Sequence, residues 1–143
     1  MKKTFSLLTL AAALAASVSI VGCSGSSSSS DDVIKIGVFE PLTGANGAGG
    51  ADEYDGIKLA NKLFPEVLGK KVELVVVDNK SDKVEAANAA MVLAQKEKVN
   101  AVLGSWGSSL SMAGGPIFAE AKIPAVAVSA TANTWSSRAV PCR

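Results

Sequence analysis

The 143-residue sequence contains no histidine and only two cysteines, Cys23 and Cys142. Without histidine, the chain has no Ser–His or Cys–His pair for nucleophilic catalysis and no imidazole ligand for a metal ion. Because Cys23 lies beside the N-terminal segment, Cys142 has no partner within the rest of the chain, and an internal disulfide framework is excluded. We therefore expect neither an enzyme nor a metal ion or other cofactor.

The chain carries little net charge. Lysine and arginine number 14 and aspartate and glutamate 13, and removal of Lys2 and Lys3 with the N-terminal segment leaves 12 against 13, a net charge of −1. No basic patch with interleaved aromatic residues is present, so we expect no nucleic-acid partner.

The first 22 residues form a candidate export signal. Lys2 and Lys3 precede the uncharged, mostly apolar run Ser6–Val21. The following letters IVGC, Ile20–Cys23, resemble the bacterial lipobox. That resemblance implies cleavage before Cys23 and a lipid anchor on its sulfur, which would place the protein on the extracytoplasmic face of the cell membrane. The alternative is an ordinary secretory signal followed by a chance cysteine.

Residues 23–32 are rich in serine and should form a tether between the anchor and the folded part. A Gly/Ser-rich run cannot bury apolar surface and behaves as a flexible coil. The alternative is a disordered terminus without that role.

Four apolar runs after residue 32 predict β-strands. The last three are almost continuous in valine, leucine, isoleucine and alanine, which is typical of parallel strands covered on both faces. The runs are Val33–Phe39, Lys71–Asp78, Asn100–Ser105 and Ile123–Ala130.

Between the predicted strands lie three segments with helical periodicity. Their apolar faces are predicted to be Tyr54, Ile57, Ala60 and Leu63, then Val84, Ala87, Met91 and Ala94, then Leu110, Ala113, Ile117 and Ala121.

Three local signals refine these helices. Gly69, in the turn Leu68–Lys71, is expected to end the first helical region, and Asp82 stands at capping-box spacing from Glu85. Pro116 and the two glycines before it predict a kink or a late start in the third helix. The alternation of strands and helices predicts an α/β fold, a parallel sheet flanked by helices on both faces.

Small and hydroxylic residues follow each predicted strand. In open parallel sheets, ligands bind beyond the carboxyl ends of the strands. A helix that begins near Ser108 would present free N–H groups to an anion, so Ser108 and Thr131 could hold a carboxylate while the carbonyl of Ser129 accepts from an ammonium. Trp106 would form an apolar wall. The alternative is structural: Ser108 or Ser109 caps the helix and Trp106 packs in the core.

The sequence gives only weak signals for a nucleotide site or a metal site. The letters GANGAGG lack both common glycine-rich nucleotide patterns, and Gly69–Lys70 precedes a strand rather than a helix, which argues against nucleotide binding. Asp78 and Asp82 are a weak signal for a metal, and a strand-end acid followed by an N-cap explains them better.

Two stretches of the sequence resemble a known family. The letters IKIGVFEPLTGANGAGGADEYDGIKLA, residues 34–60, and VLGSWGSSLSMAGGPIFAEAKIPAVAVSAT, residues 102–131, are similar to bacterial leucine/isoleucine/valine-binding proteins. These are substrate-binding lipoproteins of ABC importers, and their fold has two α/β lobes that close on an amino acid. The resemblance implies an ABC permease as partner and a monomer at full length.

The resemblance also implies roles for individual residues. Ser108 matches the serine that holds the ligand carboxylate, and Ser109 beside it is counted with the predicted ligand-binding residues. Ser129 and Thr131, with Ala130 between them, match the pair that contacts the ammonium and carboxylate. Gly49 lies near the place where some members carry an aromatic residue over the ligand side chain. This chain has none there, and Trp106 is expected to supply that wall.

The resemblance has limits at the C-terminal side. Family members are well over twice as long, and after the position of Thr131 they usually continue into a strand that enters the second lobe. We therefore expect residues 33–131 to be part of the N-terminal lobe, without the second lobe. Residues 132–143 are expected to be an atypical tail, which a gene fragment or a frameshift would explain. Amino-acid capture for an ABC importer is the favoured function, and a ligand-sensing lipoprotein that uses the same lobe is the alternative.

Overall fold

The computed structural model describes residues 33–132. The predicted signal (1–22), the tether (23–32) with Cys23, and residues 133–143 of the predicted tail lie outside the described residues. Among the described residues, no helix has both the length and the apolar character needed to cross a membrane.

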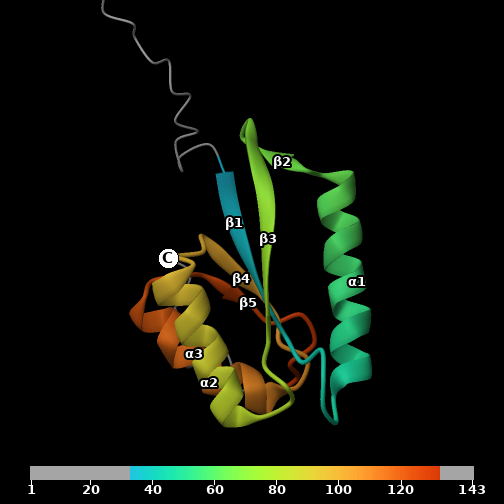
Figure 1. Cartoon of the computed structure of the whole chain (residues 1–143), viewed down its shortest axis with the longest axis vertical. Helices are drawn as coiled ribbons and strands as arrows, with labels where there is room; N and C mark the ends of the chain where they lie inside the picture. The colour runs from blue at the N-terminus through green and yellow to red at the C-terminus, as the bar shows by residue number, and fades with distance from the viewer. Residues whose placement is uncertain (1–32, 133–143) are drawn as a thin grey trace, which may run out of the picture.

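The described residues form a five-stranded sheet with helices on both faces (Figure 1). The strand order is β2-β3-β1-β4-β5, and every neighbouring pair is parallel except β2 with β3. The strands are β1 Val33–Glu40, β2 Glu66–Val67, β3 Lys70–Asp78, β4 Ala101–Leu103 and β5 Ala125–Val126. The predicted α/β fold with a parallel sheet is therefore confirmed.

The two central strands match the sequence prediction, whereas the two later ones are shorter than predicted. β1 and β3 pair along eight residues, from Val33 with Lys71 to Glu40 with Asp78. The ladder of β4 ends at Gly104, whose φ of 114° leaves the extended region. β5 lies at the edge of the described sheet, where Val126 and Val128 are exposed and no further strand pairs with them.

A β-hairpin that the sequence analysis did not predict joins the first helix to β3. Residues Leu68 and Gly69 have φ values of 53° and 74°, and they turn the chain from β2 into the antiparallel β3. The prediction that Gly69 ends the helix is wrong, because the helix already ends at Leu63, before Pro65, which cannot donate a helical hydrogen bond.

The helices are α1 Gly47–Leu63, α2 Lys83–Met91 with the π-helical extension η2 Val92–Lys96, and α3 Ser108–Glu120. Helix α1 covers one face of the sheet alone, while α2 and α3 lie together on the other face (Figure 1). Helix α3 begins at Ser108 and runs through Pro116, so the predicted late start is wrong. The carbonyl of Gly107 accepts hydrogen bonds from Leu110 and Ser111 and so starts the helix ahead of its glycines.

The core lies between the sheet and the pair α2–α3, and small residues make its close packing possible. A Cβ on Gly114 would lie 2.8 Å from the ring of Phe39 and 3.3 Å from the Cβ of Ala90. The buried face of α2 is Ala86, Ala89 and Ala90, followed by Leu93 in η2.

The predicted faces of the helices are only partly right. For α2 the prediction is mostly wrong, because Val84 and Met91 are 67% and 40% exposed and other alanines face the core instead; of the predicted residues, Ala94 in η2 is buried as predicted. Packing against α3 selects small side chains there rather than the bulkier apolar ones. On α1 Ile57 is buried as predicted, but Leu63 is 64% exposed. On α3 Leu110 is buried.

Candidate functional site

The loops at the carboxyl ends of β1 and β3 are joined by Asp78. Its Oδ1 accepts from the backbone N–H of Leu42 and Lys80, both at 2.8 Å, and its Oδ2 accepts from the Thr43 hydroxyl at 2.6 Å. Burial alone raises the pKa of Asp78, but the hydrogen bonds from Thr43, Lys80 and Leu42 outweigh it and lower the pKa below its usual value. Asp78 is therefore an ionised residue that fixes two loops.

Asp82 caps α2. Its Oδ1 accepts from the backbone N–H of Val84 at 2.8 Å and of Glu85 at 3.0 Å, which satisfies two free donors of the helix. The Glu85 carboxylate pairs with Lys80 at 3.1 Å instead of closing a full capping box. Asp78 and Asp82 thus have the structural roles that the sequence favoured, and residues 33–132 hold no cluster of three potential metal ligands.

A buried polar network fixes the loop between β4 and α3. The side-chain amide of Asn79 donates to the hydroxyl of Ser105 at 2.9 Å, and the Ser111 hydroxyl accepts from the Ser105 N–H at 3.2 Å and donates to its carbonyl at 3.0 Å. All three residues are completely buried. Because unpaired polar groups in such a place are costly, this network holds the residue that follows, Trp106, in a defined position.

Trp106 lies at the surface of this edge, not in the core. Its side chain is 38% exposed, and its backbone N–H donates to Oε2 of Glu40 at 2.7 Å. The indole lies against Gly49, where an added Cβ would be 2.5 Å from its Cε2 and Nε1 atoms. A side chain at position 49 and the indole of Trp106 therefore compete for the same space. That Trp106 supplies the ligand wall in place of an aromatic residue at Gly49 stays a prediction.

Ser108 and Thr131 meet at the start of α3. The Ser108 hydroxyl oxygen accepts from the backbone N–H of Thr131 and from that of Ala132, each at 3.1 Å. The alternative in which Ser108 or Ser109 caps the helix is wrong, because the N-cap residue is Gly107 and no side chain caps the helix.

The remaining predicted residues lie next to this contact without taking part in it. Ser109 and Ser129 are exposed, and Ala130 is half-buried. Among the described residues, no hydrogen bond joins their side chains to Ser108, so their part in ligand binding stays a prediction.

Sequence analysis did not single out Glu40, which ends β1. Its side chain is completely buried, and its carboxylate contacts the loop that contains Trp106. The pKa of Glu40 is raised to about 8: burial is the largest cause, the hydrogen bond from Trp106 opposes it, and the charge and hydrogen bonding of Glu53 add to it. The only hint in the sequence is an acid at the end of an apolar strand, directly before Pro41.

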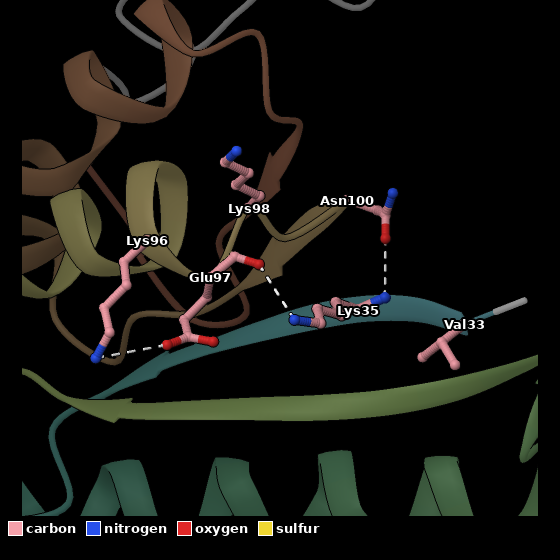
Figure 2. Close-up of a pocket in the computed structure, with 6 residues that line it drawn as sticks. All are labelled: Val33, Lys35, Lys96, Glu97, Lys98 and Asn100. Atoms are coloured by element: carbon pink, nitrogen blue, oxygen red, sulfur yellow. Dashed lines mark hydrogen bonds and ion pairs between the residues drawn. The ribbon is translucent and has the colours of Figure 1, made fainter. Parts of the chain in front are cut away.

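A hollow of about 400 Å³ lies at the opposite edge of the sheet, beside the start of β1 (Figure 2). Lys35 bridges it, with its Nζ 3.4 Å from the Glu97 carbonyl and its backbone N–H 2.8 Å from Oδ1 of Asn100. Lys96 pairs with the Glu97 carboxylate at 3.9 Å. The hollow lies at the amino ends of β1 and β4, whereas Ser108 and Thr131 lie beyond the carboxyl ends, so it is not part of the candidate site.

Comparison with known proteins gives a consistent result. The sequence pattern of the periplasmic binding proteins matches residues 33–141. The chain is similar to the leucine-binding protein LivK of Thermotoga maritima, with 46% identity and a TM-score of 0.65 over 66% of this chain and 27% of that one. It is also similar to LivJ of Streptococcus pneumoniae, solved with isoleucine, at 32% identity and a TM-score of 0.70 over 73% of this chain and 31% of that one.

A third similar structure binds a different kind of ligand. It is a solute-binding protein of an ABC transporter from Rhodopseudomonas palustris in complex with 3,4-dihydroxybenzoic acid, with 28% identity and a TM-score of 0.72 over 76% of this chain and 30% of that one. No curated protein gave a match. The chain thus spans less than a third of the length of each of these three relatives. The family pattern covers well over half of this sequence, and the chain belongs to the periplasmic binding protein family.

Proposed function

We propose that this chain is part of a solute-binding protein that captures amino acids, branched-chain or similar, for an ABC importer. The observation that carries the proposal is the meeting of Ser108 and Thr131 at the start of α3, two residues after the exposed Trp106. Hydroxyls and the free N–H groups at the start of α3 can hydrogen-bond a carboxylate. The indole offers an apolar surface for an aliphatic side chain. The similarity to a leucine-binding protein and to an isoleucine complex supports this ligand class.

Aromatic acids are a second candidate class. The relative in complex with 3,4-dihydroxybenzoic acid supports it, and an exposed indole suits an aromatic ring as well as an aliphatic chain. An aromatic acid has a carboxylate but no ammonium group. The two classes therefore differ in whether the ligand must also present an ammonium to the carbonyl of Ser129.

Titration calorimetry on the full-length protein distinguishes the two classes. Leucine and 3,4-dihydroxybenzoate would be titrated into the parent, into Ser108→Ala and into the control Gly56→Ala, whose added Cβ meets no other part of the chain. We expect tight binding of leucine only, with a loss of about tenfold to a hundredfold in Ser108→Ala, the effect of one hydrogen bond to a charged group. Tighter binding of the aromatic acid than of leucine would favour the second class, and a leucine affinity of Ser108→Ala equal to that of the control would remove Ser108 from the site.

The proposal includes the cellular setting of the protein. Members of this family act outside the cytoplasm, and we place this protein there, tethered by a lipid on Cys23 and delivering its ligand to an ABC permease. Genes for a permease and an ATPase beside the gene of this protein would support transport. A sensor kinase gene in that position would instead favour the sensing alternative.

A further inference from the structure

Glu40 occupies a position that is costly for a carboxylate. It is completely buried at the end of β1, and only its Oε2 has a partner, the N–H of Trp106 at 2.7 Å. Its Oε1 is buried and accepts no hydrogen bond. Gly104 lies directly against the carboxyl group and leaves no room for a further side chain. A buried carboxylate with an unpaired oxygen is unfavourable unless a proton or a donor reaches that oxygen.

Glu53 on α1 also has a carboxylate oxygen without a hydrogen-bond partner. Its Oε2 is also buried without a donor. Glu53 acts on the same carboxyl group, because its charge and hydrogen bonding are among the causes that raise the pKa of Glu40 to about 8. Two carboxylates are both acceptors and repel each other, but a carboxylic acid can donate to a carboxylate. One proton held between Glu40 and Glu53 would give both unpaired oxygens a partner.

The proposed ligand wall rests on the same part of α1. Gly49 and Glu53 are four residues apart, so they lie on one face of the helix. The indole of Trp106 covers Gly49, and the backbone of Trp106 is bonded to Glu40. Trp106 is thus attached to α1 twice: directly through its ring, and indirectly through the two carboxyl groups.

Building on the proposed function, we propose that Glu40 and Glu53 share one proton and that this acid pair positions the Trp106 wall of the ligand site. Loss of the proton leaves two negative charges facing each other below the loop. Repulsion between them separates α1 from the β4–α3 loop and loosens the contact of the indole with Gly49. Glu40 and Glu53 are positioning residues, which act on the ligand through Trp106.

The other charged groups near the pair do not replace this proton. Asp78 lies opposite Glu40 on β3, but its oxygens already accept from Leu42, Thr43 and Lys80. The Lys80 ammonium pairs with the partly exposed Glu85 near the start of α2. The loop between β4 and α3 contains no ionisable side chain, and the one on α3, Glu120, stands at the far end of that helix.

The test uses the full-length protein in which every tryptophan other than Trp106, Trp135 included, is replaced with phenylalanine, so that the fluorescence reports on Trp106. Its fluorescence is followed from pH 6 to pH 9.5 without ligand, and leucine affinity is measured at both ends of that range. We expect the Trp106 signal to titrate with a midpoint near pH 8. We expect leucine affinity to fall by roughly tenfold at the high end.

Three variants make the result specific. Glu40→Gln can still accept from Trp106 and can donate to Glu53 without a titrating proton, so the fluorescence should stay constant and the leucine affinity should keep its pH 6 value. Glu53→Gln removes the repelling charge, so the midpoint should move to lower pH. Glu85→Gln, which changes a partly exposed acid on α2, should behave like the parent.

A constant Trp106 signal in the parent, or an unchanged titration in Glu40→Gln, would overturn the acid pair. A Trp106 titration with the expected variant pattern but no leucine binding at any pH would support the pair and overturn the proposed ligand class.

Discussion

Replacing Gly49 with alanine tests whether the indole of Trp106 lies on Gly49. The clash with the indole should oppose the stabilising effect that alanine usually has in a helix. Gly49 lies in the first turn of the helix, and its added Cβ would be 2.5 Å from Cε2 and Nε1 of the indole and 2.8 Å from Cδ2. The indole must therefore move away. Without such a neighbour, glycine to alanine in a helix stabilises a protein by up to about 1 kcal/mol. The two effects have opposite signs.

The free-energy cost of the clash between the added Cβ and the indole follows from how tightly this contact is packed. Overfilling a packed contact costs about 1–3 kcal/mol, and the low end applies here because the indole is 38% exposed and can swing outward. We expect Gly49→Ala to be neutral or destabilising by about 1 kcal/mol in the parent. In a Trp106→Ala background the same change should stabilise by up to about 1 kcal/mol. The expected coupling between the two positions is thus about 1–2 kcal/mol.

Urea unfolding of the four proteins in this cycle measures that coupling. Gly56→Ala is a matched control on the same helix, because Gly56 has no atom of another part of the chain within 4 Å of its added Cβ. It should stabilise the protein equally with and without Trp106. If Gly49→Ala were as stabilising as Gly56→Ala in the parent, the indole would not lie on Gly49, and the argument for Trp106 as the ligand wall would fail.

Four further outcomes are expected. Ser108→Ala should lower stability by about 1 kcal/mol in addition to its effect on binding, because two backbone N–H groups lose their acceptor, whereas Ser109→Ala should leave the urea midpoint unchanged. Asp82→Ala should cost about 1 kcal/mol in the same assay through loss of the α2 cap. Cys23→Ala should abolish partition into detergent if this residue carries the lipid. The pKa of Glu40 is about 8 in the fold against 4.5 in the unfolded chain. The contribution of protonated Glu40 to the free energy of unfolding should therefore be fully present below about pH 4.5 and be lost as the pH rises through 8, and Glu40→Gln should flatten this decline.

Much of the fold could be predicted because its signals are local. The apolar runs at β1 and β3 are long and bounded by polar loops, and the alternation with helical segments leaves a parallel sheet as the favoured arrangement. The carboxyl ends of parallel strands then lie at one edge, which is why Ser108 and Thr131, 23 residues apart, could be expected to meet.

Features that depend on a specific neighbour could not be predicted. On α2, the valine and methionine with helical spacing face outward, since α3 approaches through Gly114 and leaves room only for alanine. The hairpin at Gly69 depends on where α1 stops, and a glycine after a helix fits both a helix end and a strand turn. In each case one local pattern allows two structures, and a contact distant in the sequence decides between them.

Glu40 shows this most clearly. A glutamate between a strand and a proline is ordinarily expected to be solvated, because its charge is costly to bury. Here it accepts a hydrogen bond from the N–H of Trp106, 66 residues away, and the carboxyl of Glu53 on α1 helps to raise its pKa. Neither partner alone accounts for the burial: the N–H satisfies one oxygen, and the second carboxyl is favourable only if a proton comes with it. The requirement for that proton arises only when β1, α1 and the β4–α3 loop are assembled. The acid pair is therefore a property of the fold that no single segment encodes, and it lies where the proposed ligand wall is attached.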